Sequence, residues 1–375
     1  MNENGPAALD GMTIAAADLR AFATEILLRT GMAPDDAGLA ADVIVDANLR
    51  GVDTHGAFLL TIYTRRLRLG LINPTPQMRF ERRRAAVGML DADHGMGHVA
   101  TARAMEQAIA MAKESGVASV LVTGSNHFGA AAYYVRMAAE QGCIGMVFSP
   151  AEASVAPFGG RQRFFGTNPI AVATPPGHTY PGLTLDMATS AVAGGKIHLA
   201  GKTRKTIPEG WAIDPQGRPV IEPSDDDAAL RSYLLLPLGG AKGYGLAAMV
   251  EWMTSLLGGT QWGPQIVRWT EDWEHQVNLS HYVQAIDVEA FEALDAYRRR
   301  VDLFCAALKD VAPADGVAEV LLPGEPELRT ARRRAVEGCP LSAYHVRVLS
   351  DLGASLGVPF PGPASEREAG ATSRS

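Results

Sequence analysis

Four short segments of the sequence place reactive side chains among glycines. Each contains a histidine, an acid or a lysine that can exchange a proton or carry charge, beside small residues that let a ligand approach the backbone. The four segments are Asp53-Thr54-His55-Gly56, Gly124-Ser125-Asn126-His127-Phe128-Gly129, Leu185-Asp186-Met187-Ala188-Thr189-Ser190 and Gly239-Gly240-Ala241-Lys242-Gly243-Tyr244-Gly245.

His55 is the first candidate for acid–base chemistry. It falls at the expected start of a helix, where the N-terminal dipole lowers the pKa of an imidazole and leaves it neutral at pH 7. A lone histidine there is more often structural, but His127 in a similar loop favours a functional interpretation. Asp186 ends an apolar strand, where it either orients an imidazole or contacts ribose or backbone amides.

Two glycine-rich segments suggest phosphate binding, one more strongly than the other. The glycines around Lys242 let backbone amides approach a phosphate while the ammonium supplies charge; the alternative is an exposed loop lysine. The run from Gly95 to Ala100 fits the GxGxxA turn of a Rossmann fold. The next strand, however, ends in Gly124 and Ser125 without the acid that binds ribose in that fold, so we expect only a strand-to-helix turn that requires small residues.

Composition narrows the class of protein. With 47% apolar residues in 375, the chain is neither disordered nor fibrous. Its net charge of −7 opposes binding to nucleic acid or an anionic membrane, so a small-molecule substrate is expected. The three cysteines have no zinc-binding spacing and indicate a reduced, cytoplasmic protein without a metal site. Neither a signal peptide nor an apolar run of about 18 residues is found.

The pattern of apolar residues predicts the elements that position these segments. Helical spacing in the first 75 or so residues predicts one helix capped by Thr13, a second from Pro34 and a third from about His55 to Gly70. Further on, short apolar runs alternate with helices, which is typical of an α/β protein. Strands are expected at 86–90, 117–124, 143–149, 168–175, 182–188 and 281–287, helices at 99–114 and 133–140, and a core helix after Gly245.

Together the four segments resemble the malate/L-lactate/ureidoglycolate dehydrogenase family, the sulfolactate dehydrogenase-like group that binds nicotinamide cofactors without a Rossmann fold. The resemblance covers nearly the whole chain, with the matching segments in the family's order. The additional matching segments lie at 50–53 (RGVD), 165–169 (FGTNP), 194–197 (GGKI), 208–212 (PEGWA), 237–238 (PL) and 323–327 (PGEPE).

The resemblance implies an α/β (α+β) fold with a helical N-terminal domain and a mostly antiparallel, non-Rossmann cofactor-binding sheet. It also implies a homodimer with the active site between domains. We therefore expect a helical domain over 1–80 with 335–364 packed against it, and an α/β core over 81–334 that contains the cofactor domain at about 125–260. Residues 365–375 are expected to form a disordered tail.

The reaction implied is reversible hydride transfer between NAD(P)H and the α-carbon of a 2-keto acid or its hydroxy form. His55 would then donate and accept the proton, supported by Thr54 and Asp186, and His127 would be catalytic or close to the cofactor. Substrate contacts would come from Thr167 and Asn168. The residues that match cofactor contacts of the family are His127, Phe128, Gly129, Asp186, Met187, Ala188, Lys242, Gly243, Gly324 and Glu325.

Two departures from the family pattern shape the remaining expectations. Phe58 and Leu59 stand where many relatives have an arginine that binds the substrate carboxylate, which predicts a larger or less charged substrate than malate or lactate. Gly194 replaces another arginine, which favours NAD slightly over NADP. Two alternatives stay open: a reductase of cyclic or other C=N substrates on the same scaffold, and a catalytically silent homologue.

Overall fold

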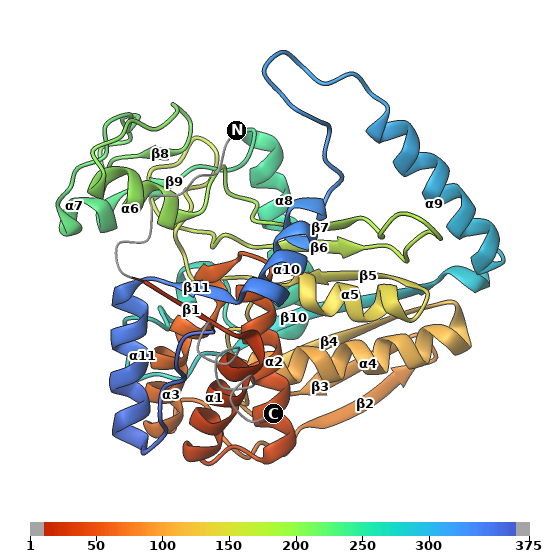
Figure 1. Cartoon of the computed structure of the whole chain (residues 1–375), viewed down its shortest axis with the longest axis horizontal. Helices are drawn as coiled ribbons and strands as arrows, with labels where there is room; N and C mark the ends of the chain where they lie inside the picture. Colours follow the sequence, from red (N-terminus) through yellow and green to blue (C-terminus); the bar gives the residue numbers. More distant parts are fainter. Residues whose placement is uncertain (1–10, 365–375) are drawn as a thin grey trace, which may run out of the picture.

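The computed structural model describes residues 11–364, and a seven-stranded sheet lies at its centre (Figure 1). The strand order is β2-β3-β4-β10-β5-β6-β7, in which only β3 and β4 run parallel. This mostly antiparallel order confirms the predicted fold class. The strands are β2 (Arg79–Arg84), β3 (Val87–Asp91), β4 (Val117–Ser125), β5 (Cys143–Phe148), β6 (Ile170–Ala173), β7 (Thr184–Met187) and β10 (Leu279–Asp287).

Both faces of the sheet are covered by helices. On one face, Val147 and Val283 pack in the core beneath α4 (Gly97–Ser115) and α5 (Ala132–Glu140). On the other, Phe148 contacts apolar residues of α8 (Ala241–Glu251) and of the π-helical turn Trp252–Leu256 that continues it. Burial from both sides explains why strands such as β5 and β6 are apolar runs instead of strictly alternating patterns.

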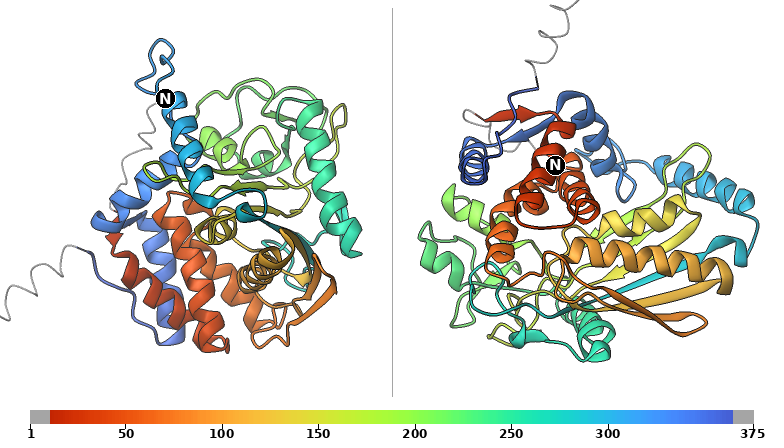
Figure 2. Two further views of the ribbon diagram at one scale, coloured as in Figure 1. Left: turned by 90° about the vertical axis from the view of Figure 1, so that its right-hand side faces the viewer. Right: turned by 90° about the horizontal axis from the view of Figure 1, so that it is seen from below.

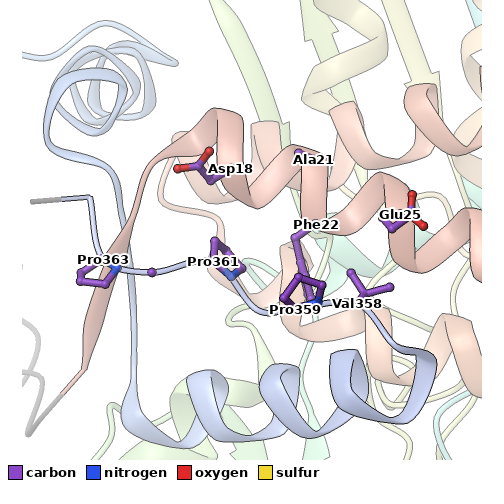
Figure 3. Close-up of a pocket in the computed structure, with 9 residues that line it drawn as sticks. Asp18, Ala21, Phe22, Glu25, Val358, Pro359, Pro361 and Pro363 are labelled. Carbon is purple, nitrogen blue, oxygen red and sulfur yellow. The ribbon is translucent and has the colours of Figure 1, made fainter. Parts of the chain in front are cut away.

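The N-terminal helices and the C-terminal end of the chain form one helical unit. It contains α1 (Ala16–Arg29), α2 (Pro34–Leu49), α3 (Leu60–Arg68) and α11 (Ala343–Leu356), and Figure 2 shows the last beside the first three. A short strand, β11 (Cys339–Leu341), pairs antiparallel with β1 (Met12–Ile14). Beyond α11, residues 358–363 run along α1 (Figure 3). The ring centroids of Phe360 and Phe22 lie 5.1 Å apart.

Two further groups of elements complete the fold. A small unit consists of α6 (Gly194–Lys202), α7 (Asp227–Ser232), β8 (Ala212–Ile213) and β9 (Leu234–Leu235) around its own apolar cluster. Helix α9 (Leu294–Lys309) projects from the body of the molecule, and α10 (Glu325–Glu337) returns to contact α2 (Figure 1). Within residues 11–364, no helix is long and apolar enough to cross a membrane.

The structure corrects three predictions about the elements. Thr13 pairs within β1 and does not cap a helix, because α1 begins only after Ala15. The third helix begins at Leu60, after two 3₁₀ turns, and His55 is the last residue of the first turn. The helix after Gly245 is not wholly a core helix, since Leu256 and Leu257 at its end are exposed. The tail expected at 365–375 lies outside the described residues.

Candidate active site

An outer cavity of about 620 Å³ collects most of the predicted site residues. Its walls come from α2, the turn that carries His55, the start of α5, strand β7 and the segment 321–327. Many lining residues are glycine or alanine, which keeps the cavity wide. The predicted site residues that line it are Thr54, His55, Gly129, Thr167, Asp186, Ala188 and Gly324.

A second, inner cavity of about 60 Å³ adjoins the first. The two share four lining residues, among them His55, so this histidine stands where the cavities meet. Apolar side chains such as Ile266, Val267 and Leu279 form much of the inner wall, and Glu152 is its one carboxylate. Neither arginine nor lysine is among the residues that line it.

The turn that carries His55 is braced by side chains from two helices. Asn48 at the end of α2 donates to Asp53 at 2.7 Å and accepts the backbone N–H of Ala57 at 2.7 Å. Gly56 allows this close packing, because a Cβ there would lie 2.3 Å from Oδ1 of Asn48. Arg334 of α10 binds both carboxylate oxygens of Asp53 at 2.8 and 3.0 Å.

The imidazole of His55 has one hydrogen-bonding contact within the described residues. Its Nδ1 lies 3.0 Å from the hydroxyl of Thr54, as the resemblance implies, and this leaves Nε2 for a substrate. Burial lowers the pKa of His55 below its usual 6.5. The predicted lowering of the pKa is therefore right, but its cause is desolvation. A helix dipole is not the cause, because His55 ends a 3₁₀ turn and does not begin a helix.

His127 lines the inner cavity with its ring between aromatic neighbours. Tyr63 Oη lies 2.7 Å from Nδ1, and the indole of Trp269 stacks on the ring at 4.4 Å. The loop that carries His127 approaches α4 closely, and a Cβ at Gly97 would lie 2.1 Å from the carbonyl oxygen of Asn126. The glycine motif at 95–100 thus positions His127, in keeping with the interpretation that its turn requires small residues.

Asp186 faces the outer cavity from strand β7. Its carboxylate accepts the backbone N–H of Ala132 at 2.8 Å, at the first turn of α5. Solvent reaches the carboxyl through the cavity, yet the surrounding protein desolvates it and raises its pKa to about 6. Of the roles left open by the sequence, contact with backbone amides is the one observed, and no hydrogen bond joins Asp186 to His55 within residues 11–364.

Comparison with known protein families identifies the family of this chain. Residues 14–350 match the family described as malate/L-lactate dehydrogenase. The chain belongs to this family. It is therefore an oxidoreductase that acts on 2-hydroxy acids with a nicotinamide cofactor.

Individual dehydrogenases of the family match over most of their length. The L-sulfolactate dehydrogenase of Methanocaldococcus jannaschii is 40% identical over 310 residues, covering 83% of this chain and 88% of the relative. The NAD(+) ureidoglycolate dehydrogenase of Escherichia coli is 34% identical, covering 87% and 92%. The NADP(+)-dependent (2R)-3-sulfolactate dehydrogenase of Chromohalobacter salexigens is 37% identical, covering 79% and 87%.

The fold of this dehydrogenase also matches a solved structure. Sulfolactate dehydrogenase from Methanocaldococcus jannaschii superposes with a TM-score of 0.87 at 36% identity, covering 93% of this chain and 98% of that one. The N-terminal helices and the mostly antiparallel sheet are thus those of a sulfolactate dehydrogenase-like enzyme.

The outer cavity of this dehydrogenase fits a nicotinamide cofactor. Its volume falls within the range of about 300–1,000 Å³ of ligand pockets, and its walls are small residues with a few polar groups. Arg50 and Arg136 both line it, and each binds Asp46, so two guanidinium groups share one carboxylate. The lining also includes the carboxylates of Asp186 and Glu327, so the cavity as a whole has no surplus of positive charge, but the two guanidinium groups can bind a pyrophosphate directly. Arg50 lies in a segment that matches the family, whereas no sequence signal singled out Arg136.

Several predicted contact residues lie away from both cavities of the dehydrogenase. Lys242 and Gly243 belong to the first turn of α8 and line neither cavity. Met187 also lies outside both linings, and Glu325 binds Lys309 and Arg329 instead. Their roles as cofactor contacts therefore stay predictions that this geometry does not support.

Two other predicted site residues, Asn168 and Phe128, are buried and make contacts within the fold. Asn168 is fully buried, accepts the N–H of Ala151 at 3.0 Å and donates to Glu251 at 3.1 Å. Of the two predicted substrate residues, only Thr167 lines the cavities. Phe128 lines the inner cavity but is 4% exposed, and its ring stacks on His281 at 4.6 Å.

A separate hollow of about 480 Å³ between α1 and residues 358–363 contains none of the predicted site residues (Figure 3). Among residues 11–364, no group of three or more histidine, cysteine, aspartate or glutamate side chains could hold a metal ion.

Proposed function

We propose that this enzyme oxidises a small, weakly charged 2-hydroxy acid reversibly to the 2-keto acid, with His55 as the residue that exchanges the proton. The observation that carries the proposal is the position of His55 in the wall shared by the two cavities. A group at that junction can face a cofactor on one side and a substrate on the other. Bound NAD(P) supplies the acceptor or donor of the hydride.

The side chains around His55 support both directions of proton transfer. Because burial lowers its pKa, the ring is neutral at pH 7 and can accept the proton of a hydroxyl group as the hydride leaves. The hydroxyl of Thr54 holds Nδ1 and directs Nε2 to the substrate. In the reverse direction, the imidazolium form returns the proton to the oxygen of the keto acid.

The cofactor would lie in the outer cavity. Gly129, Ala188 and Gly324 leave space for it, Asp186 offers a carboxylate for ribose hydroxyls, and Arg136 offers positive charge. We favour NAD over NADP, because Gly194 follows the lining residue Ala193 where relatives have an arginine, so no guanidinium stands there for a second phosphate. A tenfold preference for NADP in binding, about 1.4 kcal/mol, would contradict this choice.

The substrate side chain would enter the inner cavity. Its apolar wall and the carboxylate of Glu152 disfavour a second acidic group, because a buried like charge is strongly unfavourable. Phe58 stands where many relatives have a carboxylate-binding arginine. Its ring stacks on that of His345, with the centroids 4.7 Å apart. The small volume limits the side chain to a few atoms, so we propose a less charged substrate and not a larger one.

The decisive experiment is a substrate panel read at the nicotinamide absorbance, combined with one substitution. We expect turnover of 2-keto acids with short neutral side chains and slow turnover of oxaloacetate. In His55→Ala, hydride transfer should fall by about 10² to 10⁴ while cofactor still binds. His198→Ala, at an exposed histidine outside both cavities, is the matched control. Turnover of a cyclic imine alone would support the C=N reductase instead.

The enzyme is further proposed to be a homodimer. Trp252, Leu256 and Leu257, at the end of the helix that covers the sheet, are 61%, 53% and 64% exposed, and such an apolar face favours self-association. Sedimentation of Trp252→Glu tests this, because a charge there should shift the enzyme to monomer. Val336→Glu, at a residue 87% exposed on α10, should leave the assembly unchanged.

A cytoplasmic location is proposed from the cysteines. Cys143, Cys305 and Cys339 are all buried free thiols, as expected for a protein of a reducing compartment.

A further inference from the structure

Tyr63 is a fully buried tyrosine whose hydroxyl meets the ring of His127. Its Oη lies 2.7 Å from Nδ1 and has no other hydrogen-bond partner within residues 11–364. Burial raises the pKa of Tyr63 well above 10, so the phenol keeps its proton. A buried hydroxyl gives its proton to an acceptor, and Nδ1 of His127 is the one within reach.

A second donor points at the same ring nitrogen. The backbone N–H of Gly129 lies 3.4 Å from Nδ1 of His127, and a backbone N–H can only donate. A nitrogen that faces two donors carries no proton of its own. Burial also lowers the pKa of His127 well below 6.5, and the neutral ring then has its single proton on Nε2.

Helix α3 holds this arrangement rigidly. The indole of Trp269 stacks on His127 at 4.4 Å and on Tyr63 at 5.5 Å, with interplanar angles of 17° and 12°. Arg66, three residues after Tyr63 and fully buried, donates to the carbonyl oxygen of Trp269 at 3.1 Å. One helix therefore supplies the hydroxyl that fixes the proton and the guanidinium that fixes the stacking partner.

His127 shares the proposed substrate cavity with His55. His127 and His55 both line the inner cavity, with ring centroids 5.7 Å apart and rings inclined by 21°. Two N–H groups up to about 5.8 Å apart can both reach one oxygen at about 2.9 Å. No arginine or lysine lines this cavity, so Nε2–H of His127 would join the hydroxyl of Thr167 as a donor to a carbonyl oxygen there.

We propose that Tyr63 is a positioning residue that locks His127 as a neutral Nε2–H donor to the substrate oxygen that His55 protonates. The inference rests on the proposed function and assigns the two histidines different tasks. His55 exchanges the proton, whereas His127 never acts as a base and stabilises the negative charge that builds on the oxygen as hydride arrives.

The first test is independent of catalysis. Nitrogen NMR of the enzyme labelled with ¹⁵N-histidine, with His127→Asn to assign the signals, should show an unprotonated Nδ1 and a protonated Nε2 on His127 near pH 7. A protonated Nδ1, or protons on both nitrogens, would overturn the proposal. This measurement needs no substrate, so it is valid even if the enzyme turns over no compound of the panel. Lack of turnover would count against the proposed function and not against the assigned tautomer.

The second test removes only the hydroxyl. In Tyr63→Phe the ring still fills its site, but Nδ1 loses its strong donor, so we expect the His127 signals to shift towards a mixture of tautomers. The kcat of keto-acid reduction should fall about tenfold with KM almost unchanged, because the lost hydrogen bond strengthens only in the transition state.

Tyr133→Phe is the matched control. Its hydroxyl donates to Asp42 at 2.8 Å, outside both cavities, so neither the spectrum nor kcat should change. If Tyr63→Phe keeps a pure Nε2–H tautomer and the kcat of the unmodified enzyme, the proposal is wrong. If that variant does not fold, the spectrum of the unmodified enzyme still decides the protonation of Nδ1.

Discussion

Arg334 binds both carboxylate oxygens of Asp53, two residues before His55 in the chain. The guanidinium is 12% exposed and the carboxylate 35%, so the pair is partly shielded from water. Through it, α10 near the C-terminal end of the chain holds the turn that presents His55, the proposed acid–base residue. The candidate active site therefore depends on a contact between segments far apart in the sequence.

Removing this contact should weaken both folding and catalysis. In Arg334→Ala we expect the free energy of unfolding to fall by about 1.5–3 kcal/mol, the range for hydrogen bonds between charged groups. The value of kcat/KM should fall as well, because the turn of His55 loses its brace. Urea unfolding and steady-state assays measure the two effects.

The neighbouring arginine provides the control for this pair. Arg333 is exposed and its Nε lies 3.9 Å from Glu337, so Arg333→Ala should change stability by less than about 1 kcal/mol. Equal losses in the two variants would show that the contact with Asp53 has no special role.

The pH dependence of catalysis should follow His55. Burial lowers its pKa below 6.5, and within residues 11–364 no carboxylate is hydrogen-bonded to the ring to oppose this. Oxidation needs the neutral ring, so kcat/KM should rise with pH through this pKa and stay level above it. Reduction needs the imidazolium and should decline over the same interval. Profiles that share an apparent pKa above 7 would argue against this assignment.

The ionised carboxylate of Asp186 should lower the stability of the folded enzyme at neutral pH. Its pKa is about 6 in the fold against 3.8 ordinarily, so between these values the folded state binds more protons than the unfolded state. The contribution of Asp186 to stability is then most favourable below about pH 4 and declines as pH rises to about 6. Asp186→Asn removes the ionised form, so it should be more stable than the unmodified enzyme at pH 7 but not at pH 4.

The same substitution should weaken cofactor binding. A carboxylate accepts hydrogen bonds from ribose hydroxyls more strongly than an amide oxygen does, so the Kd for NADH should rise about tenfold. Fluorescence titration measures this. A variant that gained stability and kept its full affinity would show that Asp186 does not contact the cofactor.

Two glycine substitutions should have opposite effects on stability. A Cβ at Gly97 would lie 2.1 Å from the carbonyl oxygen of Asn126, so Gly97→Ala should cost about 1–3 kcal/mol and displace the loop of His127. At Gly245, on an exposed side of α8, no atom lies within 4 Å of the added Cβ. Gly245→Ala should therefore stabilise the helix by about 0.5–1 kcal/mol. Denaturant unfolding distinguishes the two variants.

Much of the fold follows from local patterns that the sequence shows directly. The buried strands, such as β4 and β5, are apolar runs that each follow a glycine, and α2 begins at the predicted Pro34. Strand β1 could not be recognised, because its three residues are stabilised only by pairing with β11, more than 300 positions later. A local pattern contains no information about such a partner.

The sequence by itself determined which side chains can do the chemistry: His55, His127 and Asp186 stand beside small residues at the ends of elements. Tertiary structure alone decided how each one works. In the proposal Tyr63 of α3 fixes the proton on His127, which lies in a loop. The backbone N–H of Ala132 donates to the carboxylate of Asp186, and burial, not a helix dipole, lowers the pKa of His55. Protonation and hydrogen bonding depend on neighbours in space, and those neighbours are fixed only when distant segments pack together.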